Sequence, residues 1–226
     1  MNEPDSRHIR SFVKRSGHVT QSQRTARQQL LSKWGVPYGA EPIDFKEIFS
    51  REARVVLEIG FGMGETTAAI AKANPDWNIL GAEVYRAGVG SLLARIEQQG
   101  LSNIRIIEHD VVEVLCNMIK PESLDAVHIY FPDPWPKKRH HKRRLIQPAF
   151  LDLLAPKLKT GGVLHMATDW PNYADQMLAV CSAHPQLRNR SIQGFSPRPE
   201  WRPVTKFESR GMRLGNPVAD LIFEKI

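Results

Sequence analysis

The feature that most constrains the fold of this chain is a regular alternation of short apolar runs with longer segments, which begins at Arg54. Residues 54–59, RVVLEI, are apolar, rich in β-branched side chains and followed by glycine, which is typical of a buried strand. Similar runs occupy residues 77–84, 103–110, 124–131, 163–169 and 219–226. Strands that alternate with helices predict right-handed β-α-β units, and therefore an α/β fold with a parallel sheet and helices on both faces.

The segments between these runs have the lengths and end signals of helices. We expect helices over residues 65–75, 87–100, 143–162 and 171–184, several of which stop at glycine or proline. Upstream, residues 1–35 form a basic N-terminal arm that we expect to be partly mobile, with a short helix over residues 21–33. Residues 36–226 then form one domain.

The composition narrows the class of partner. Lysine and arginine exceed aspartate and glutamate by 31 − 24 = 7, which favours a polyanion over a neutral ligand. The two cysteines, Cys116 and Cys181, lie far apart and fit neither a disulfide framework nor a metal site. The chain starts without an apolar signal segment and contains no run of about 18 apolar residues. We therefore expect a cytoplasmic protein that binds neither membrane nor metal.

Acidic side chains follow four consecutive predicted strands, and this is the most informative feature of the sequence. In parallel sheets, ligands bind outside the carboxyl ends of the strands. The residues placed there are the glycine-rich stretch 60–64, Glu83, Asp110, Asp133 and Asp169. We expect these groups to line one cleft.

The glycine-rich loop, with Glu58 before it and Gly60, Gly62 and Gly64 within it, indicates a nucleotide-like ligand. It lacks the GK[ST] of a phosphate-binding P-loop, and Glu65 stands where a dinucleotide-binding loop has its third glycine. Acidic groups beside the loop repel a pyrophosphate but attract an ammonium and a sulfonium. S-adenosyl-L-methionine carries both, with Glu83 placed for its ribose hydroxyls and Asp110 for its adenine. A nicotinamide dehydrogenase is a distant alternative.

The stretch FPDPWPKKRHHKRRL sets a rigid acidic corner beside the densest positive charge of the chain. Prolines on both sides of Asp133 fix the backbone and forbid helix, so the corner can hold a group in place. The basic run, Lys137 to Arg144, favours phosphates strongly at low salt. A packed proline turn and a solvated basic surface are the alternatives, but neither explains why the two adjoin at the mouth of a cofactor site.

Taken together, the motifs LEIGFGMG, GAEVYRAGVG, FPDPWPKKRHHKRRL, ATDW and TKFESRG resemble those of the bacterial tRNA (guanine-N7)-methyltransferases over residues 55–226. The resemblance implies a seven-stranded, mostly parallel, doubly wound sheet with an antiparallel C-terminal strand, as in class I methyltransferases. It implies transfer of a methyl group from S-adenosyl-L-methionine to N7 of a guanine in the tRNA variable loop. One departure is GAEVY in place of the usual GIEVH, which puts Tyr85 where histidine is expected.

The resemblance also implies roles for individual residues. Asp133 is implied as the catalytic aspartate, and the implied cofactor contacts are Glu58, Gly60, Gly62, Gly64, Glu83, Asp110 and Asp133. The implied substrate contacts are Lys137, Asp169, Thr205, Lys206, Phe207 and Glu208. The implied RNA contacts are Arg139, His140, His141, Lys142, Arg143 and Arg144. The implied partner is tRNA, and the sequence leaves a monomer and a homodimer open.

The chemistry predicts an orienting and electrostatic role for Asp133 rather than general-base work, with Asp169 or Glu208 as the second candidate. Guanine N7 already has a free lone pair, so no proton is removed before attack, and positive charge moves from the sulfonium to the base. A fixed carboxylate near that base stabilises the developing cation. Two alternatives remain open. One is a methyltransferase for an exocyclic amine of adenine or cytosine, since DPWP resembles the [DN]PP[YF] corner of such enzymes. The other is a non-catalytic RNA-binding subunit with a vestigial cofactor pocket.

Overall fold

The structure is a computed structural model that describes residues 19–204, 208 and 217–226. Its centre is a seven-stranded sheet in the order β3-β2-β1-β4-β5-β7-β6. The strands are β1 (Arg54–Ile59), β2 (Trp77–Ala82), β3 (Ile104–Ile107), β4 (Leu124–Tyr130), β5 (Leu158–Thr168), β6 (Leu187–Asn189) and β7 (Ala219–Lys225). The pairings from β3 to β5 are parallel, whereas β7 runs antiparallel to both β5 and β6. The predicted α/β fold, with its antiparallel C-terminal strand, is confirmed.

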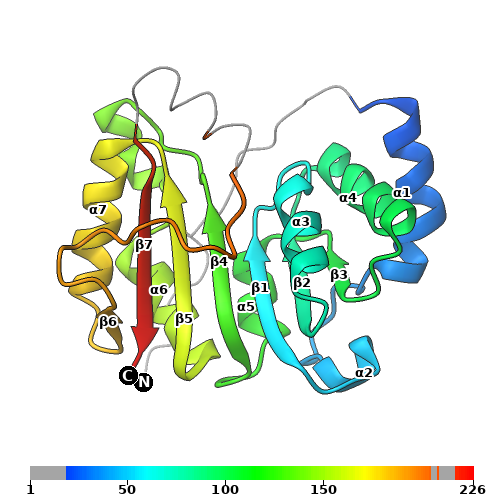
Figure 1. Ribbon diagram of the computed structural model, residues 1–226, viewed down its shortest axis with the longest axis horizontal. Helices are drawn as coiled ribbons and strands as arrows, with labels where there is room; N and C mark the ends of the chain where they lie inside the picture. Colours follow the sequence, from blue (N-terminus) through cyan, green and yellow to red (C-terminus); the bar gives the residue numbers. More distant parts are fainter. Residues whose placement is uncertain (1–18, 205–207, 209–216) are drawn as a thin grey trace.

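Helices cover both faces of the sheet (Figure 1). They are α1 (Gln21–Trp34), α2 (Phe45–Phe49), α3 (Glu65–Ala73), α4 (Arg86–Gln99), α5 (Val111–Asn117), α6 (Pro148–Leu154) and α7 (Pro171–Ser182), with short 3₁₀ turns η2 (Lys138–Arg143) and η3 (Ala155–Lys157). One apolar cluster joins α5, α6 and α7 to the sheet, and the other joins α3 and α4. Across the part of the chain that is described, every helix is too short or too polar to span a membrane.

Helix α1 shows where the expected N-terminal arm becomes part of the domain. Thr20 and Gln23 form a reciprocal capping box that starts the helix, with Oγ1 of Thr20 accepting from the backbone of Gln23. The helix lies against α4, where a side chain at Gly90 would come within 2.2 Å of the Gln23 carbonyl. Arg27 then pairs with Glu108 at 2.5 Å. The structure thus places residues 21–34 on the domain, while the expected mobility of residues 1–18 lies outside the described residues.

The segment predicted as one helix over residues 143–162 differs from the structure. Pro156 lies in η3, and strand β5 begins at Leu158, so Gly161 and Gly162 belong to a strand. The register against β4 shifts between Leu124 and Ala126, which accommodates these glycines at a bulge. A Gly-Gly pair marks a helix stop and a strand bulge equally well, so the sequence alone did not separate the two.

Candidate functional site at the carboxyl edge of the sheet

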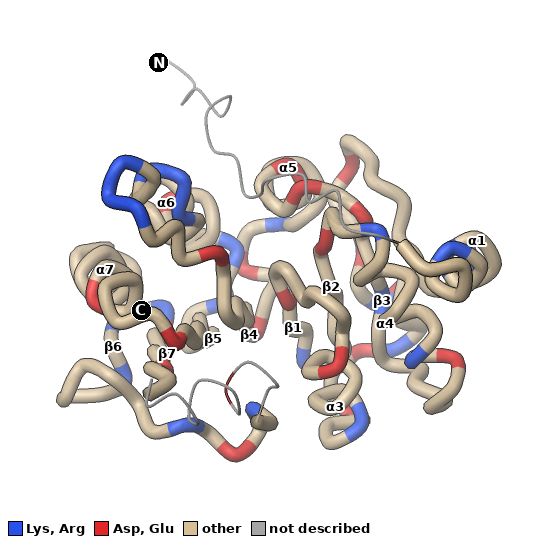
Figure 2. Tube along the Cα trace, turned by 90° about the horizontal axis from the view of Figure 1, so that it is seen from above, with Lys and Arg blue, Asp and Glu red and all other residues tan. Residues whose placement is uncertain are grey.

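The carboxyl ends of the central strands are level with one another, because ladder hydrogen bonds continue just past the strands. The Gly60 amide donates to the Ala82 carbonyl at 2.9 Å, and the Glu83 amide donates to the Ile107 carbonyl at 3.1 Å. On the other side, the Phe131 amide donates to the Ala167 carbonyl at 2.8 Å. Figure 2 looks onto this edge and shows acidic positions over the central strands, with a basic stretch beside α6. The structure therefore brings the predicted strand-end residues to one edge.

The glycine-rich loop makes a tight turn from β1 into α3. Gly60, Gly62 and Gly64 all have positive φ, and Gly64, at φ 72°, caps α3 where an added side chain would collide with Leu92 at 2.6 Å. In contrast, a side chain added at Gly60 or Gly62 would meet nothing within 4 Å. The loop therefore leaves open space in front of its backbone, as a loop that receives a ligand must.

Glu58 lies beneath this loop and is almost fully buried. Its side chain is 3% exposed, and among the described residues its Oε2 has no hydrogen-bond partner. Burial is the largest cause that raises the pKa of Glu58 to about 7; a contact with the Thr67 side chain lowers this pKa, and the nearby charge of Glu83 contributes to the rise. An isolated buried carboxylate is costly unless a cation or a donor reaches it. Glu58 is thus poised for a cationic group that enters the space above the loop.

Glu83 connects the end of β2 to the glycine-rich loop. Its Oε2 accepts from the Gly62 amide at 2.9 Å, and its Oε1 accepts from the Val84 and Tyr85 amides at 2.8 and 2.9 Å. The contact with Tyr85 is made by its backbone, so the departure from histidine at this position does not alter it. The carboxylate of Glu83 fixes the loop and lies beside the open space.

Asp110 follows β3 and begins α5. Its side chain caps the helix, since Oδ1 accepts from the Val112 amide at 3.0 Å. Just before it, the ring of His109 stacks on Tyr38 with centroids 3.7 Å apart. The capping bond holds the half-buried Asp110 at the same edge as Glu83.

The acidic corner after β4 is held in a strained conformation. Phe131 and Trp135 have φ values of 51° and 46°, a region that bulky side chains rarely adopt. Asp133 lies between them and is half-buried. Such strain persists only where surrounding contacts enforce it, and it is concentrated at functional sites. One of these contacts is a hydrogen bond of 2.8 Å from Arg144 Nε to the Pro134 carbonyl.

The basic run folds back over the corner as η2. Trp135 packs inward against it, with its ring 5.8 Å from that of His140 and 5.0 Å from the Arg143 guanidinium. His140 and His141 are half-buried, and slight burial together with neighbouring cations lowers the pKa of His140. The exposed members that remain for phosphate contact are Lys137, Lys138, Arg139, Lys142 and Arg143.

Arg144 is a correction to the expected RNA-contacting stretch. It is 3% exposed and turned into the protein, where its guanidinium donates to Gln176 Oε1 at 2.6 Å and to Asn172 Oδ1 at 2.9 Å. It also lies over the ring of Tyr173. Arg144 therefore fastens the acidic corner to α7, because all three of its guanidinium nitrogens donate to protein groups.

The expected substrate residues fall at two places. Asp169 follows β5 at the same edge and is half-buried. Glu208 is 5% exposed and pairs with Arg202 at 2.6 Å. Thr205, Lys206 and Phe207 lie outside the described residues. Sequence reasoning missed Arg202, although polar residues inside apolar strand runs, such as His165, were an available signal of a buried polar network.

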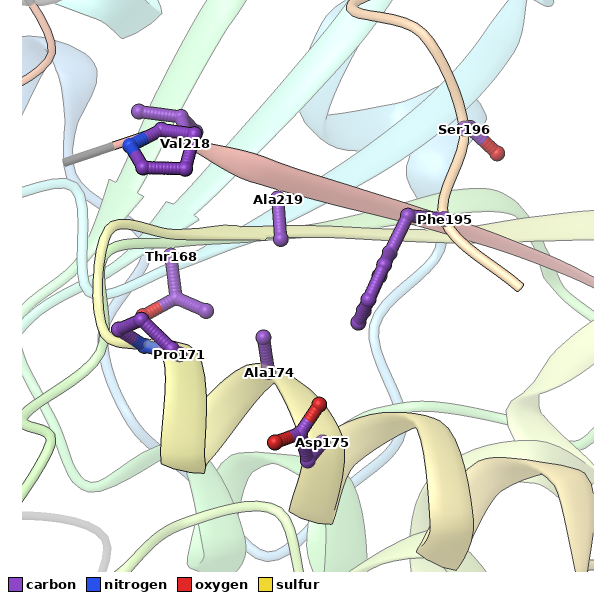
Figure 3. A pocket seen from close by; sticks show the side chains of 9 residues that line it. Thr168, Pro171, Ala174, Asp175, Phe195, Ser196, Val218 and Ala219 are labelled. Atoms are coloured by element: carbon purple, nitrogen blue, oxygen red, sulfur yellow. The ribbon is translucent and has the colours of Figure 1, made fainter. Parts of the chain in front are cut away.

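A small cavity of about 210 Å³ is lined by Thr168, the last residue of β5, and by residues of α7 and β7 (Figure 3). It lies between the start of α7 and the start of β7, where Ala174 faces Ala219, and Phe195 closes one side. Its walls are mostly apolar, with the carboxylate of Asp175 on the α7 side. Asp169 and the other predicted site residues are not part of its lining.

The arrangement fits a cofactor with a positively charged amino acid portion. The open space in front of Gly60 and Gly62 provides room for such a group. Oε2 of Glu58, which has no hydrogen-bond partner among the described residues, provides the complementary charge. The acidic corner lies on the neighbouring strand, and the exposed cations adjoin it. The site can thus hold a cationic donor on one side and a polyanion on the other.

Comparisons with known proteins show the family of the chain and its fold. Residues 52–221 match a family described as a putative methyltransferase. A tRNA (guanine-N(7)-)-methyltransferase of Bordetella pertussis is 59% identical over 224 residues, which cover 99% of this chain and 88% of the relative. One of Nitrosospira multiformis is 56% identical over 219 residues, covering 97% and 95% of the two chains. The structure of the 16S rRNA methyltransferase KamB aligns with a TM-score of 0.56 at 16% identity, over 82% of this chain and 95% of that chain, which shows the fold alone.

Proposed function

The chain belongs to the tRNA (guanine-N7)-methyltransferase family, and from this premise we propose that it transfers a methyl group from S-adenosyl-L-methionine to N7 of a guanine in the variable loop of tRNA. The observation that carries the proposal is the shared edge of the sheet. The buried Glu58, the strained corner with Asp133 and the exposed cations of η2 all adjoin it.

The cofactor is proposed to lie across the ends of β1, β2 and β3, where it supplies an activated methyl group. Glu58 would hold its ammonium, Glu83 its ribose and Asp110 its adenine. The glycine backbone at positions 60 and 62 borders the open space that it fills. Binding of the ammonium favours the ionised form of Glu58, whose pKa burial otherwise raises to about 7.

The tRNA is proposed to be held by its phosphates beside the corner. Arg139, Lys142 and Arg143 lie in the 3₁₀ turn that directly follows the corner and are exposed. Lys137, Asp169 and the segment from Thr205 to Glu208 are the proposed contacts for the substrate guanine and its neighbours. Because phosphate binding releases counterions, affinity should fall steeply with salt.

The chain contributes positioning and charge to the transfer step. Guanine N7 attacks through its own lone pair, so a general base is not needed. Holding donor and base in line is worth up to about 7–11 kcal/mol in well-oriented systems. Positive charge then develops on the guanine ring, and the fixed carboxylate of Asp133 stabilises it. The stiffness of the corner matters here, because a carboxylate that needs no reorganisation stabilises the transition state most.

Identification of the modified nucleoside tests the proposal. The protein is incubated with tRNA that lacks this modification and with methyl-labelled S-adenosyl-L-methionine, and the digested RNA is analysed by mass spectrometry. We expect labelled 7-methylguanosine. A methylated exocyclic amine of adenine or cytosine would instead establish the alternative methyltransferase activity. Binding of tRNA without any methylated product would indicate a non-catalytic subunit.

A further inference from the structure

One half of the sheet is covered by an irregular segment rather than by a helix. Residues 190–204 cross in front of β7 and β5 on the face that carries α3 and α4 elsewhere (Figure 1). The Ser196 amide donates to the Asp220 carbonyl at 2.8 Å and fixes this segment to β7. Where this segment meets the sheet, several side chains are both polar and buried, among them His165, Arg202 and Asp220.

Arg202 is the centre of this polar region and is fully buried. Its Nε and Nη2 donate to the two carboxylate oxygens of Asp220, both at 2.7 Å. Its Nη1 and Nη2 donate to the two oxygens of Glu208 at 2.6 and 3.1 Å. One guanidinium thus holds two carboxylates through paired contacts, a geometry that lysine cannot reproduce.

The hydrogen bonds continue from Asp220 to the end of β4. His165 Nε2 lies 2.8 Å from Asp220 Oδ1, and His165 Nδ1 lies 2.9 Å from the Tyr130 hydroxyl. The indole of Trp201 also points its N–H at His165 Nδ1, at 3.3 Å. Since an indole only donates, Nδ1 is the acceptor and Nε2 carries the proton that Asp220 accepts.

The two ends of this hydrogen-bonded network lie at two parts of the proposed site. Glu208 belongs to the proposed substrate segment, and Tyr130 is the last residue of β4, directly before the acidic corner. The guanidinium of Arg202 also lies over the ring of Phe131, 6.0 Å from its centroid, and Phe131 is one of the two strained residues that flank Asp133. Arg202 therefore contacts both Glu208, in the proposed substrate segment, and Phe131, which flanks the acidic corner.

We propose that Arg202 is a positioning residue that ties Glu208, in the substrate segment, to the corner that carries Asp133. Arg202 thereby fixes the position of a bound tRNA guanine relative to the carboxylate of Asp133. Buried ionic networks are often no more stabilising than apolar packing, whereas they fix one arrangement of their parts. The network around Arg202 has one end in the substrate segment and the other at the corner, so it is suited to fixing the arrangement of these two parts.

The test compares Arg202 with a buried cation at the opposite edge of the sheet. Lys225, at the far end of β7, is 5% exposed and donates to the Leu158 carbonyl at 2.9 Å and to Glu122 at 3.1 Å. We measure kcat, the KM for tRNA and the Kd for S-adenosyl-L-methionine of Arg202→Lys and Lys225→Met. Each value is corrected for the folded fraction found by denaturant unfolding.

For Arg202→Lys we expect the KM for tRNA to rise about tenfold or more and kcat to fall, with the Kd for the cofactor within about twofold. For Lys225→Met we expect a comparable loss of stability with kcat and KM within about twofold. Equal effects of the two variants, or an unchanged KM and kcat in Arg202→Lys, would overturn the proposal. If Arg202→Lys does not fold, Asp220→Asn replaces it, with an expected rise of about threefold in the same KM.

A double-mutant comparison adds a second readout. If Arg202 acts through Glu208, then Arg202→Lys should add little to the KM change already caused by Glu208→Gln. Fully additive effects would refute that route. The inference rests on the proposed function, but different results would refute the positioning role and the function. A wild-type protein that makes no 7-methylguanosine refutes the function, whereas an active wild type with an unaffected Arg202→Lys refutes only the positioning role.

Discussion

The buried carboxyl of Glu58 should make the cofactor-free protein less stable as pH rises, and Glu58→Gln should remove this dependence. The pKa of Glu58 is raised from the ordinary value of 4.5 to about 7 in the folded protein. A group with a raised folded pKa contributes stability that is fully present below the unfolded pKa. That contribution is lost as pH rises through the folded pKa. The loss therefore falls between about pH 4.5 and pH 7.

The magnitude follows from the difference in pKa. A difference of about 2.5, at about 1.36 kcal/mol for each pKa unit, gives about 3.4 kcal/mol at full ionisation. The cost is about 0.8 kcal/mol at pH 5 and about 3.3 kcal/mol at pH 8 when both ionisation equilibria are included. The difference in unfolding free energy between Glu58→Gln and wild type should thus grow by about 2.5 kcal/mol in favour of the variant over this interval.

The assay is urea unfolding of both proteins without cofactor at pH 5, 6, 7 and 8. The wild-type curve contains every titrating group, but groups that do not interact with Glu58 cancel in the difference between the two proteins. Burying a glutamine at this position also changes the difference in unfolding free energy by an amount that does not vary with pH. Only the slope of this difference against pH is therefore diagnostic. A difference that stays flat from pH 5 to pH 8 would refute the reasoning, because it would mean that Glu58 is not held protonated by burial.

Cofactor binding supplies a complementary measurement. If the cofactor ammonium lies against Glu58, binding at pH 6 should release up to about 0.9 proton per cofactor, since most of the carboxyl is protonated beforehand. Calorimetry in two buffers with different heats of ionisation measures this proton release. Glu58→Gln should show none and should bind the cofactor more weakly.

Three further predictions test the corner, the basic run and the buried His128. Asp133→Asn should lower kcat by about 10²–10³-fold with a KM for tRNA within about threefold, and full turnover would contradict the electrostatic role. Replacing Arg139 and Lys142 by alanine should raise the KM for tRNA and lower the slope of log affinity against log salt by about 2, whereas an unchanged slope would exclude phosphate contacts. Burial lowers the pKa of His128 well below its ordinary value of 6.5, so the wild type should lose the corresponding stability as pH falls below about 6.5. His128→Gln should therefore show a smaller loss between pH 7 and pH 5 in urea unfolding, and an equal loss would refute the assignment.

The positions of the strand-end residues were predictable because parallel strands place their carboxyl ends together whatever the details of the packing. This reasoning located Glu83, Asp110 and Asp133 without any long-range contact being known. The β-branched run before Gly60 likewise predicted its strand. The prediction of one helix over residues 143–162 was wrong because the local signals are ambiguous. Proline and Gly-Gly are compatible with both a helix end and a strand bulge.

Side-chain direction within the basic run was not predictable. Eight consecutive basic or imidazole residues carry no periodic signal, so nothing in the sequence distinguishes the buried Arg144 from its exposed neighbours. Its burial depends on Asn172 and Gln176, which come from a helix after the next strand. The network around Arg202 is hidden for the same reason, because Tyr130, His165 and Asp220 lie on three different strands and are brought together only by the folded sheet.

The strained backbone of the acidic corner has a consequence for the substitutions that this protein can accept. At positive φ, glycine and asparagine are favoured over aromatic residues, yet Phe131 and Trp135 have φ values of 51° and 46°. Their rings lie against Arg202 and Arg143, respectively. Random mutagenesis screened only for heat resistance should therefore enrich glycine or asparagine at these two positions. A screen for turnover should restore the aromatic residues, so the two selections would diverge there.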